Sequence, residues 1–290
     1  MRIVHIITTL GDGGAEHSLY KVCKYDISNE HIVISLKAPG KYFLPLKKIG
    51  IKVYCIEIKN FISLFKFFYL IRLIRYLKPN AVQTWLVHGD FIGGVAAKLA
   101  GIKNIFWNVR YSNVEFGSAK VTTIVITRLL AKLSYFLPKL IVVVSRRAKK
   151  TCENLGYYKK KLHLIPNGYD LKILKPRKSQ EKYYKTKIKG TKNKKIIGTV
   201  ARFDPRKDHF NLLKAISLIN LKKVNFFCLL IGTNINKNRK LIDEIKRLKI
   251  SNHVKLLGPD SNISKVMNGL DIHVQSSSTE GFPNVVAEAM

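Results

Sequence analysis

The feature that most constrains this 290-residue chain is a regular alternation of short β-branched runs with longer runs of helical spacing. In the first part of the chain the strand-like runs lie at residues 3–8, 32–36, 53–56, 81–84, 105–109, 140–145 and 162–165. The helix-like runs between them lie at residues 15–25, 61–77, 93–100, 123–136 and 146–155. Strands that alternate with helices form βαβ units, which build a parallel sheet with helices on both faces. The sequence therefore predicts an α/β fold.

The alternation breaks once, in a lysine-rich stretch of weak periodicity that contains Pro176 and Gly190. It resumes with strands expected at residues 196–200, 226–231, 254–256 and 272–275, and with helices at residues 211–219, 239–248 and 263–269. We predict two Rossmann-like domains, at residues 1–172 and 195–290, joined by a basic linker at residues 173–194. A last helix is expected to begin near Asn284, with no later strand to bury its apolar face. We therefore expect the second domain to be truncated.

Net charge limits the partners. Lys and Arg number 52 against 18 Asp and Glu, a formal charge of +34. A field of that sign attracts nucleic acid, anionic lipid or phosphorylated substrates, although a compositional bias towards lysine would produce the same number. The chain has no RRM, KH, zinc-finger or basic-zipper signature, and its lysines are spread rather than striped. We therefore do not predict nucleic acid as a partner.

Cysteine usage and hydropathy bear on the compartment. Cys23, Cys55, Cys152 and Cys228 are isolated, which argues against a disulfide framework and a zinc site. No uncharged apolar run is long enough to cross a bilayer, and the first residues resemble a strand leading into a glycine loop rather than a signal peptide. We predict a cytoplasmic protein. Residues 61–78 combine apolar and basic residues, so this helix either rests on the inner face of an anionic membrane or covers the sheet.

The most informative string is EGFPNVVAE, from Glu280 to Glu288. It follows a strand and a polar loop, and it opens the helix expected near Asn284. A helix N-terminus offers backbone N–H groups to phosphate, and ligands of open α/β sheets bind at the carboxyl ends of strands. Glu280 in the loop and Glu288 on the helix are able to contact two ends of one elongated ligand. The alternative is an ordinary helix with an acidic first turn.

This Glu-x7-Glu string resembles the signature of the retaining GT-B glycosyltransferases of family 4. Other segments agree with that family in order: residues 13–16 (GGAE), 144–145 (VS), 166–170 (PNGYD), 198–207 (GTVARFDPRK) and 254–258 (VKLLG). The resemblance covers the whole chain. It implies a GT-B fold of two facing Rossmann-like domains and transfer of a sugar from a nucleotide sugar with retention of configuration.

The chemistry of such a transfer needs positive charge where the nucleotide diphosphate departs. Arg202 offers a planar fork for phosphate oxygens and Lys207 a point charge. The chain has no Asp-x-Asp pair to hold a divalent metal, so we predict no metal and no cofactor other than the nucleotide-sugar co-substrate, with a UDP-sugar favoured over a GDP-sugar. The alternative for both residues is a pair of solvated surface charges.

By the resemblance, Glu280 contacts hydroxyls of the donor sugar and Glu288 holds the ribose hydroxyls. The catalytic candidates are Glu280, Arg202, Lys207 and His88. The donor-binding candidates are Gly14, Arg202, Lys207, Gly281, Phe282, Asn284, Val285 and Glu288.

The acceptor-binding candidates are Glu16, His88, Asp90 and Arg110. Glu16 is placed to touch the acceptor or to act as a plain N-terminal helix charge. His88 and Asp90 follow a strand, where each is able to bond a hydroxyl or to be structural. Many members of the family carry a histidine near the position of Arg110, and a subset resembles this chain. The glycines at residues 11–14 do not match the dinucleotide fingerprint, which argues against an NAD enzyme.

Together these features predict a metal-independent hexosyltransferase of cell-envelope glycan synthesis. We expect it to move a hexose or N-acetylhexosamine from the UDP-sugar to a polyprenyl-linked or polysaccharide acceptor. One alternative is a GT-B enzyme with a small soluble acceptor, or a nucleotide-sugar epimerase. Another is a non-enzymatic basic binding module. We expect the 290 residues by themselves to be inactive, because in the family further strands complete the nucleotide cleft.

Overall fold

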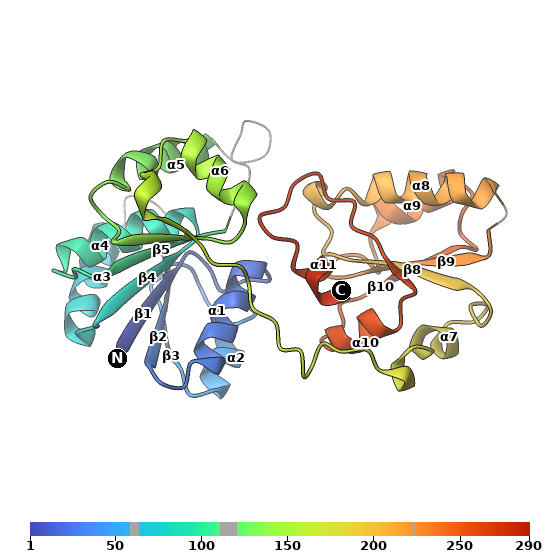
Figure 1. The fold of residues 1–290 in the computed structure, drawn as a ribbon, viewed down its shortest axis with the longest axis horizontal. Coiled ribbons are helices and arrows are strands. Elements are labelled where there is room, and N and C mark those ends of the chain that lie inside the picture. The colour runs from blue at the N-terminus through green and yellow to red at the C-terminus, as the bar shows by residue number, and fades with distance from the viewer. Residues whose placement is uncertain (59–63, 111–120, 223) are drawn as a thin grey trace. The chain divides into compact units, whose positions relative to one another are not determined.

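A computed structural model gives the structure of residues 1–58, 64–110, 121–222 and 224–290, and these form two units, Met1–Asn167 and Gly168–Met290 (Figure 1). The two units are described separately below. No helix of the described residues is long and apolar enough to span a membrane.

The first unit is built on a seven-stranded sheet in the order β3-β2-β1-β4-β5-β6-β7, with every neighbouring pair parallel. Its strands are β1 (Arg2–Ile7), β2 (Glu30–Ser35), β3 (Lys52–Cys55), β4 (Ala81–Trp85), β5 (Ile105–Val109), β6 (Leu140–Val143) and β7 (Leu162–Leu164). Val4, Ile6 and Ile34 are fully buried, as expected for parallel strands that are covered on both faces. All carboxyl ends lie at one edge, and the strand order reverses between β1 and β4, which is where ligands of doubly wound sheets bind.

Helices cover both faces of this sheet (Figure 1). One face carries α1 (Gly14–Tyr25) and α2 (Phe43–Lys48). The other carries α3 (Leu64–Leu77), α4 (Gly94–Leu99), α5 (Val121–Leu133) and α6 (Arg146–Asn154). A π-helical turn, η1 (Gly89–Gly93), leads from β4 into α4. The largest core cluster lies on the α3–α6 face around Trp107, and a smaller one lies under α1 around Trp85.

The second unit has a four-stranded parallel sheet in the order β10-β9-β8-β11. Its strands are β8 (Lys195–Val200), β9 (Phe226–Ile231), β10 (Val254–Leu257) and β11 (Ile272–His273). Helices α8 (His209–Leu221) and α9 (Arg239–Arg247) cover one face, and α7 (Tyr183–Lys187), α10 (Ile263–Asn268) and α11 (Asn284–Ala289) lie on the other (Figure 1). Two apolar clusters, one on each face, form the core.

The predicted α/β fold is confirmed, and most predicted elements agree with the structure to within a few residues. Residues 61–63 of the helix predicted at 61–77 lie outside the described part of the chain. The helix predicted at 93–100 is preceded by η1, which the pattern did not reveal. Helix α2 was missed because Pro45 interrupts its short run.

The segment predicted as a linker belongs to the second unit, whose boundary follows Asn167 rather than residue 172. Within residues 173–194, Tyr184 and Ile188 are buried against the sheet together with Phe227. Thr191 is also buried, and its hydroxyl donates to the Ile188 carbonyl at 2.6 Å. These apolar contacts hold α7 on the sheet, and the many surrounding lysines concealed them in the sequence.

Candidate functional site

Two loops meet at the carboxyl edge of the second sheet, because β8 and β11 are parallel neighbours. Residues 201–208 follow β8, and residues 274–280 follow β11. Gly198 on β8 leaves no room for a side chain, because a Cβ there would overlap the side chain of Leu270, which precedes β11. Ser276 Oγ donates to the Lys207 carbonyl at 2.8 Å, and the Ser278 N–H donates to the Arg206 carbonyl at 2.9 Å. These bonds join the loop of the predicted phosphate-binding residues to the loop of Glu280.

Lys207 and Glu280 form an ion pair across the two loops, with 2.5 Å between Lys207 Nζ and Glu280 Oε1. Both side chains are roughly three-quarters buried. Partial burial strengthens a charge-assisted bond of this kind relative to one in open solvent. The fold thus brings together two residues that lie 73 positions apart in sequence.

The short string from Asp204 to Asp208 explains how Lys207 is positioned. Asp204 accepts the Arg206 N–H at 3.0 Å and caps the 3₁₀ turn η4 (Pro205–Lys207), which Pro205 begins. Asp208 has a left-handed φ of 45° and accepts the Asn211 N–H, which caps α8. Lys207 is therefore held between two capped turns, with its side chain directed to Glu280.

Arg202 shares a carboxylate with a neighbouring arginine. Asp204 Oδ2 lies 3.1 Å from Arg202 Nη2 and 2.8 Å from Arg206 Nη2. The Arg206 hydrogen bond is the main reason why the pKa of Asp204 lies well below its usual range. The loop thus carries three cations balanced by acidic partners, Asp204 for both arginines and Glu280 for Lys207. An incoming diphosphate has oxygens of the same kind to offer these cations.

Gln275 was not among the predicted residues. Its Nε2 donates to Glu280 Oε1 at 2.9 Å and also to Ser277 Oγ. Its Oε1 is buried and has no hydrogen-bond partner among the described residues. Glu280 Oε1 is thereby held by Lys207 from one loop and by Gln275 from its own. The only signal in the sequence was the place of Gln275 in the polar run after β11.

The remaining donor-binding candidates lie where the chain enters α11. Asn284 begins the helix, and its Oδ1 accepts the Tyr169 hydroxyl at 2.8 Å. The Phe282 ring stacks on Tyr169 with 6.4 Å between centroids. Tyr169, which lies in the PNGYD string, thus supports the loop that leads from Glu280 to the helix.

Three further donor candidates complete this segment. Gly281 follows Glu280 directly, and Val285 and Glu288 lie on α11, all three half-buried. Glu280 and Glu288 therefore lie on one loop-helix segment, as predicted.

In the first unit, Arg110 occupies the carboxyl edge of the sheet. Its guanidinium lies over the Trp85 ring, 4.9 Å from the centroid. Its Nε donates to Asn108 Oδ1 at 2.7 Å, and its Nη1 donates to Ser18 Oγ at 3.2 Å and to Asn167 Oδ1. Arg110 thus joins the end of β5 to α1 and to the last residue of the unit.

Asp90 differs from its predicted role as an acceptor contact. It is fully buried, its Oδ1 accepts the Thr84 hydroxyl at 2.6 Å, and it also accepts the Asn108 backbone N–H. Burial raises its pKa well above the ordinary value. The π-helical turn directs this side chain into the core, where it connects β4 to β5. Asp90 is therefore a structural group in this structure, and its carboxyl does not face solvent.

The other three candidates of the first unit lie on the loops after β1 and β4. Gly14 is exposed and begins α1. Glu16 is 5 % exposed, and its carboxylate lies so close to Gly13 that a Cβ there would collide with it. His88 is half-buried and directly precedes η1. Glu16 is thus packed over the glycine loop rather than extended into solvent.

A buried group of potential metal ligands lies under α1, formed by His5, Cys23 and His31. Trp85 Nε1–H, a donor only, lies 3.2 Å from His5 Nδ1, which must therefore accept. His5 Nε2–H then donates to His31 Nδ1 at 2.9 Å. Burial raises the pKa of the Cys23 thiol to about 12. The Nδ1 lone pairs of His5 and His31 are thus used in hydrogen bonds. These residues therefore fit a chain of hydrogen bonds between neutral side chains better than a metal site.

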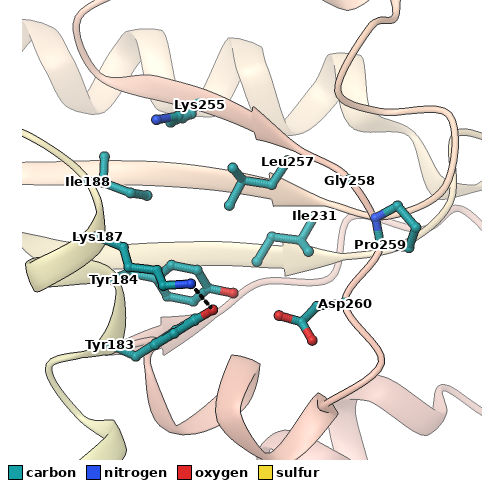
Figure 2. A pocket seen from close by; sticks show the side chains of 10 residues that line it. All are labelled: Tyr183, Tyr184, Lys187, Ile188, Ile231, Lys255, Leu257, Gly258, Pro259 and Asp260. Carbon is teal, nitrogen blue, oxygen red and sulfur yellow. Dashed lines mark hydrogen bonds between the residues drawn. The ribbon is translucent and has the colours of Figure 1, made fainter.

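A cavity of about 300 Å³ in the second unit lies apart from all predicted site residues (Figure 2). Ile231 and Leu257 contribute apolar surface, and Asp260 lies at its side (Figure 2). Lys187 Nζ donates to the Tyr183 hydroxyl at 3.0 Å, so this lysine is already bonded within the cavity wall. We therefore place the candidate site at Lys207 and Glu280, not in this cavity.

Family models match most of the chain. The family model described as "Glycosyltransferase Family 4" matches residues 12–173, and the one described as "Glycosyl transferases group 1" matches residues 181–290. An uncharacterized glycosyltransferase of Methanocaldococcus jannaschii is 28% identical over 76% of this chain. The Escherichia coli UDP-Gal:alpha-D-GlcNAc-diphosphoundecaprenol alpha-1,3-galactosyltransferase is 25% identical over 80% of it. The chain spans 55% and 59% of the length of these two relatives.

Among solved structures, Anabaena HepE in complex with UDP and glucose is similar over the whole chain. The TM-score is 0.84 at 20% identity, and the match covers 78% of the Anabaena chain. At this identity the likeness establishes the fold, which is that of the GT-B glycosyltransferases. Because the first family model covers more than half of the sequence, the chain belongs to glycosyltransferase family 4.

Proposed function

We propose that the chain belongs to an enzyme that transfers a hexose or N-acetylhexosamine from a UDP-sugar to a lipid-linked or polysaccharide acceptor, with retention of configuration. The observation that carries this proposal is the convergence of Lys207, Glu280 and Arg202 at the carboxyl edge of β8 and β11. Cations at that edge suit the departing diphosphate, and a carboxylate beside them suits sugar hydroxyls.

The relatives support the choice of donor and acceptor. By its name, the Escherichia coli relative uses UDP-Gal and an acceptor linked to diphosphoundecaprenol. The Anabaena structure contains UDP and glucose. We propose the same classes for this chain, a uridine nucleotide sugar and a glycan acceptor carried on a polyprenyl diphosphate or a polysaccharide.

The residues of the second unit define the donor half of the reaction. Arg202 and Lys207 exchange their carboxylate partners for diphosphate oxygens when the nucleotide binds, and they stabilise the charge that develops on the β-phosphate. Glu280, released by Lys207 but still held by Gln275, accepts hydrogen bonds from the donor sugar. We propose that these cations replace a divalent metal. Glu288 holds the ribose hydroxyls.

The proposed chemistry retains the anomeric configuration. The bond from the anomeric carbon to the β-phosphate oxygen breaks, and its electron pair stays on the phosphate. The acceptor hydroxyl attacks the same face, and its proton passes to the departing phosphate. Glu280 orients the sugar and is not the nucleophile. Glu16, His88 and Arg110 stay predicted acceptor contacts, whereas the burial of Asp90 removes it from this set.

The test begins with binding, because the chain spans little more than half of the curated relatives. Calorimetric titration with UDP is expected to show binding that is unchanged by a chelator and weakened in Lys207→Ala. Turnover of a full-length version is then measured with UDP-sugars and a polyprenyl-linked acceptor, and the anomer of the product is read by NMR. An inverted product contradicts retention, and loss of turnover in chelator contradicts metal independence.

The same experiment separates the alternatives. Release of an epimerised sugar without transfer identifies an epimerase. Transfer to small soluble acceptors alone identifies the first alternative acceptor class. If a full-length version does not bind UDP at all, the basic binding module is favoured and the proposal fails.

A further inference from the structure

The outward side of α3 is unusually apolar for a solvent-facing surface. Phe65 is 91% exposed, Phe68 59%, Tyr69 53% and Tyr76 77%. These positions, with Arg72 between them, form one stripe along the helix, since residues three and four apart share a face. The opposite stripe, which includes Leu70 and Ile74, is fully buried against the sheet. The exposed aromatics therefore belong to a well-packed helix and not to one that has failed to pack.

Two more helices on the same face of the sheet extend this surface (Figure 1). Helix α4 packs beside α3 and exposes Leu99. Helix α5 exposes Val121, Val125 and Leu129, which also lie on one stripe. We call the outward side of α3, α4 and α5 the outer face. Exposed apolar side chains gathered on one side of a globular unit indicate an interaction site.

The charges of the outer face have one sign. The described residues of α3, α4 and α5 include no Asp or Glu. Arg72, Lys98, Arg128 and Lys132 are exposed among the apolar side chains. Aromatic rings next to basic residues are the composition of surfaces that bind at the boundary between lipid headgroups and acyl chains. Each basic residue near an anionic leaflet adds to the attraction.

The second unit provides the contrast that selects a lipid partner. It also carries exposed apolar residues, such as Leu171 and Leu218, but all of the exposed aromatics among the described residues lie in the first unit. Lysines occur throughout both units, so positive charge alone does not distinguish one unit from the other. The joint presence of aromatics and cations, without acids, distinguishes the outer face. A protein partner matched to so cationic a surface would need an acidic counterpart, whereas an anionic bilayer supplies it uniformly.

We propose that the outer face docks on an anionic lipid bilayer, with Phe65, Phe68 and Tyr76 entering the interface and Arg72, Arg128 and Lys132 contacting lipid phosphates. In a parallel sheet the helices start at the carboxyl edge, so the first turns of α3 and α5 adjoin the edge that holds Arg110 and Glu16. Docking there holds this edge next to the headgroups. This placement rests on the proposed function in one respect: a lipid-linked acceptor gives the reason for holding the edge at the headgroups.

The test is co-sedimentation with vesicles of phosphatidylcholine alone or with phosphatidylglycerol added. The wild-type chain is expected to bind the anionic vesicles only. The variant Arg72→Gln, Arg128→Gln, Lys132→Gln is expected to partition roughly 100-fold less, because each basic residue contributes about fivefold. The variant Phe65→Ser, Phe68→Ser, Tyr76→Ser is expected to lose binding as well, which a purely electrostatic surface would not show.

A matched control removes the same charge from the second unit, as Lys214→Gln, Lys240→Gln, Lys246→Gln, and is expected to bind vesicles as the wild type does. Equal losses in the control and in the α3–α5 charge variant would overturn the proposal, since net charge would then explain binding. Self-association of the wild type by light scattering, abolished by the aromatic variant without any vesicle binding, would also overturn it and assign the face to a second copy of the chain.

UDP titration of every variant separates this inference from the proposed function. Unchanged UDP affinity in variants that no longer bind vesicles supports both. Vesicle binding without UDP binding in the wild type sinks the proposed function and leaves the outer face intact. UDP binding with no vesicle binding sinks only the present inference.

Discussion

The carboxyl edges of the two sheets hold their polar groups in different ways. In the first unit Asp90 is buried and bonded to both β4 and β5, and Arg110 is bonded to Asn108, Ser18 and Asn167 over the Trp85 ring. In the second unit Lys207, Glu280 and Arg202 are only partly buried, and each meets an opposite charge.

This difference separates scaffold from binding surface. Asp90 keeps Thr84 and Asn108 paired in the core, although its Oδ2 has no partner among the described residues, and moving it would leave those two groups buried and unpaired, which is expensive. An ion pair near solvent exchanges one anion for another at small net cost. The cations of the second unit are therefore suited to exchange their carboxylate partners for phosphate oxygens. Asp90 instead holds β4 and β5 together.

The strongest test of this comparison removes the cations of the second unit. Arg202→Ala and Lys207→Ala should each lower UDP affinity by roughly 10- to 100-fold, because a hydrogen bond to a charged group contributes about 1.5–3 kcal/mol. The double variant should lose more. Isothermal titration calorimetry measures both, with Lys240→Ala as a charge-matched control on α9. Equal affinity in the double variant and the wild type would remove the diphosphate assignment.

The second test targets Asp90. Burial raises the pKa of Asp90 well above its ordinary value and so favours the uncharged carboxyl, which is why the isosteric, uncharged Asp90→Asn should cost little stability. Asp90→Leu should lower the free energy of unfolding by about 1–3 kcal/mol, because its hydrogen-bond partners are left buried and unpaired. Urea unfolding measures the change, and UDP affinity should not move in either variant. A stable Asp90→Asn protein that has lost transfer would restore Asp90 as an acceptor-side base.

The third test measures how the free energy of unfolding depends on pH, through the buried, hydrogen-bonded histidines His5 and His31 of the first unit. Burial lowers the pKa of His5 to about 3, from the ordinary 6.5. Above pH 6.5 the His5 imidazole is neutral in both the folded and the unfolded state, so it adds no pH dependence to the free energy of unfolding. Between pH 6.5 and 3 only the unfolded state takes the proton, and stability falls by roughly 1 kcal/mol per pH unit.

Urea unfolding between pH 7.5 and 5 measures that slope. His5→Gln should flatten it relative to the wild type, whereas His163→Gln, at an exposed position, should not. An unchanged slope in His5→Gln would mean that other groups, such as His17, whose pKa burial lowers to about 4, dominate the acid response.

The smallest expected effect is at Gln275. If Gln275 holds the Glu280 carboxylate once Lys207 has moved to the phosphate, Gln275→Leu should lower kcat by roughly 10-fold, since a hydrogen bond to a charged group contributes at least about 1.5 kcal/mol. KM for the UDP-sugar should be nearly unchanged, and Gln275→Asn should not rescue because its amide is one methylene short. Ser278→Ala, an exposed neighbour, is the control. A rise in KM with constant kcat would contradict this role and would instead indicate that Gln275 only helps to bind the UDP-sugar before the reaction.

Much of this arrangement could be read from the sequence, for identifiable reasons. Periodicity located nearly every strand, because parallel strands are short continuous apolar runs such as FFCLLI at Phe226–Ile231. The Lys207–Glu280 pairing could not follow from spacing alone, since the two residues are 73 positions apart. The pairing depends on β8 and β11 being neighbours in the sheet, and that strand order has no signature in either segment.

The misses have physical causes too. The burial of Asp90 depends on η1, a π-helical turn that has no periodic signature. Helix α7 was hidden because two apolar contacts, at Tyr184 and Ile188, decide its position among many lysines. The outer face could be predicted only in part, because the exposure of Phe65 and the place of α3 and α5 on one face of the sheet are properties of the folded unit and not of either segment.

The central position of β1 has a consequence for how the chain is made. This strand is synthesised before both of its neighbours, and it pairs on one side with β2 and on the other with β4, whose residues are Ala81–Trp85. At about 5–20 residues per second, the ribosome delivers that second neighbour roughly 4 to 16 seconds after β1. During that interval Val4, Ile6 and Ile7, which are fully buried in the finished sheet, have one edge without its partner. The nascent chain therefore presents the apolar residues of β1 early, and chaperone protection should matter most before residue 85 has emerged.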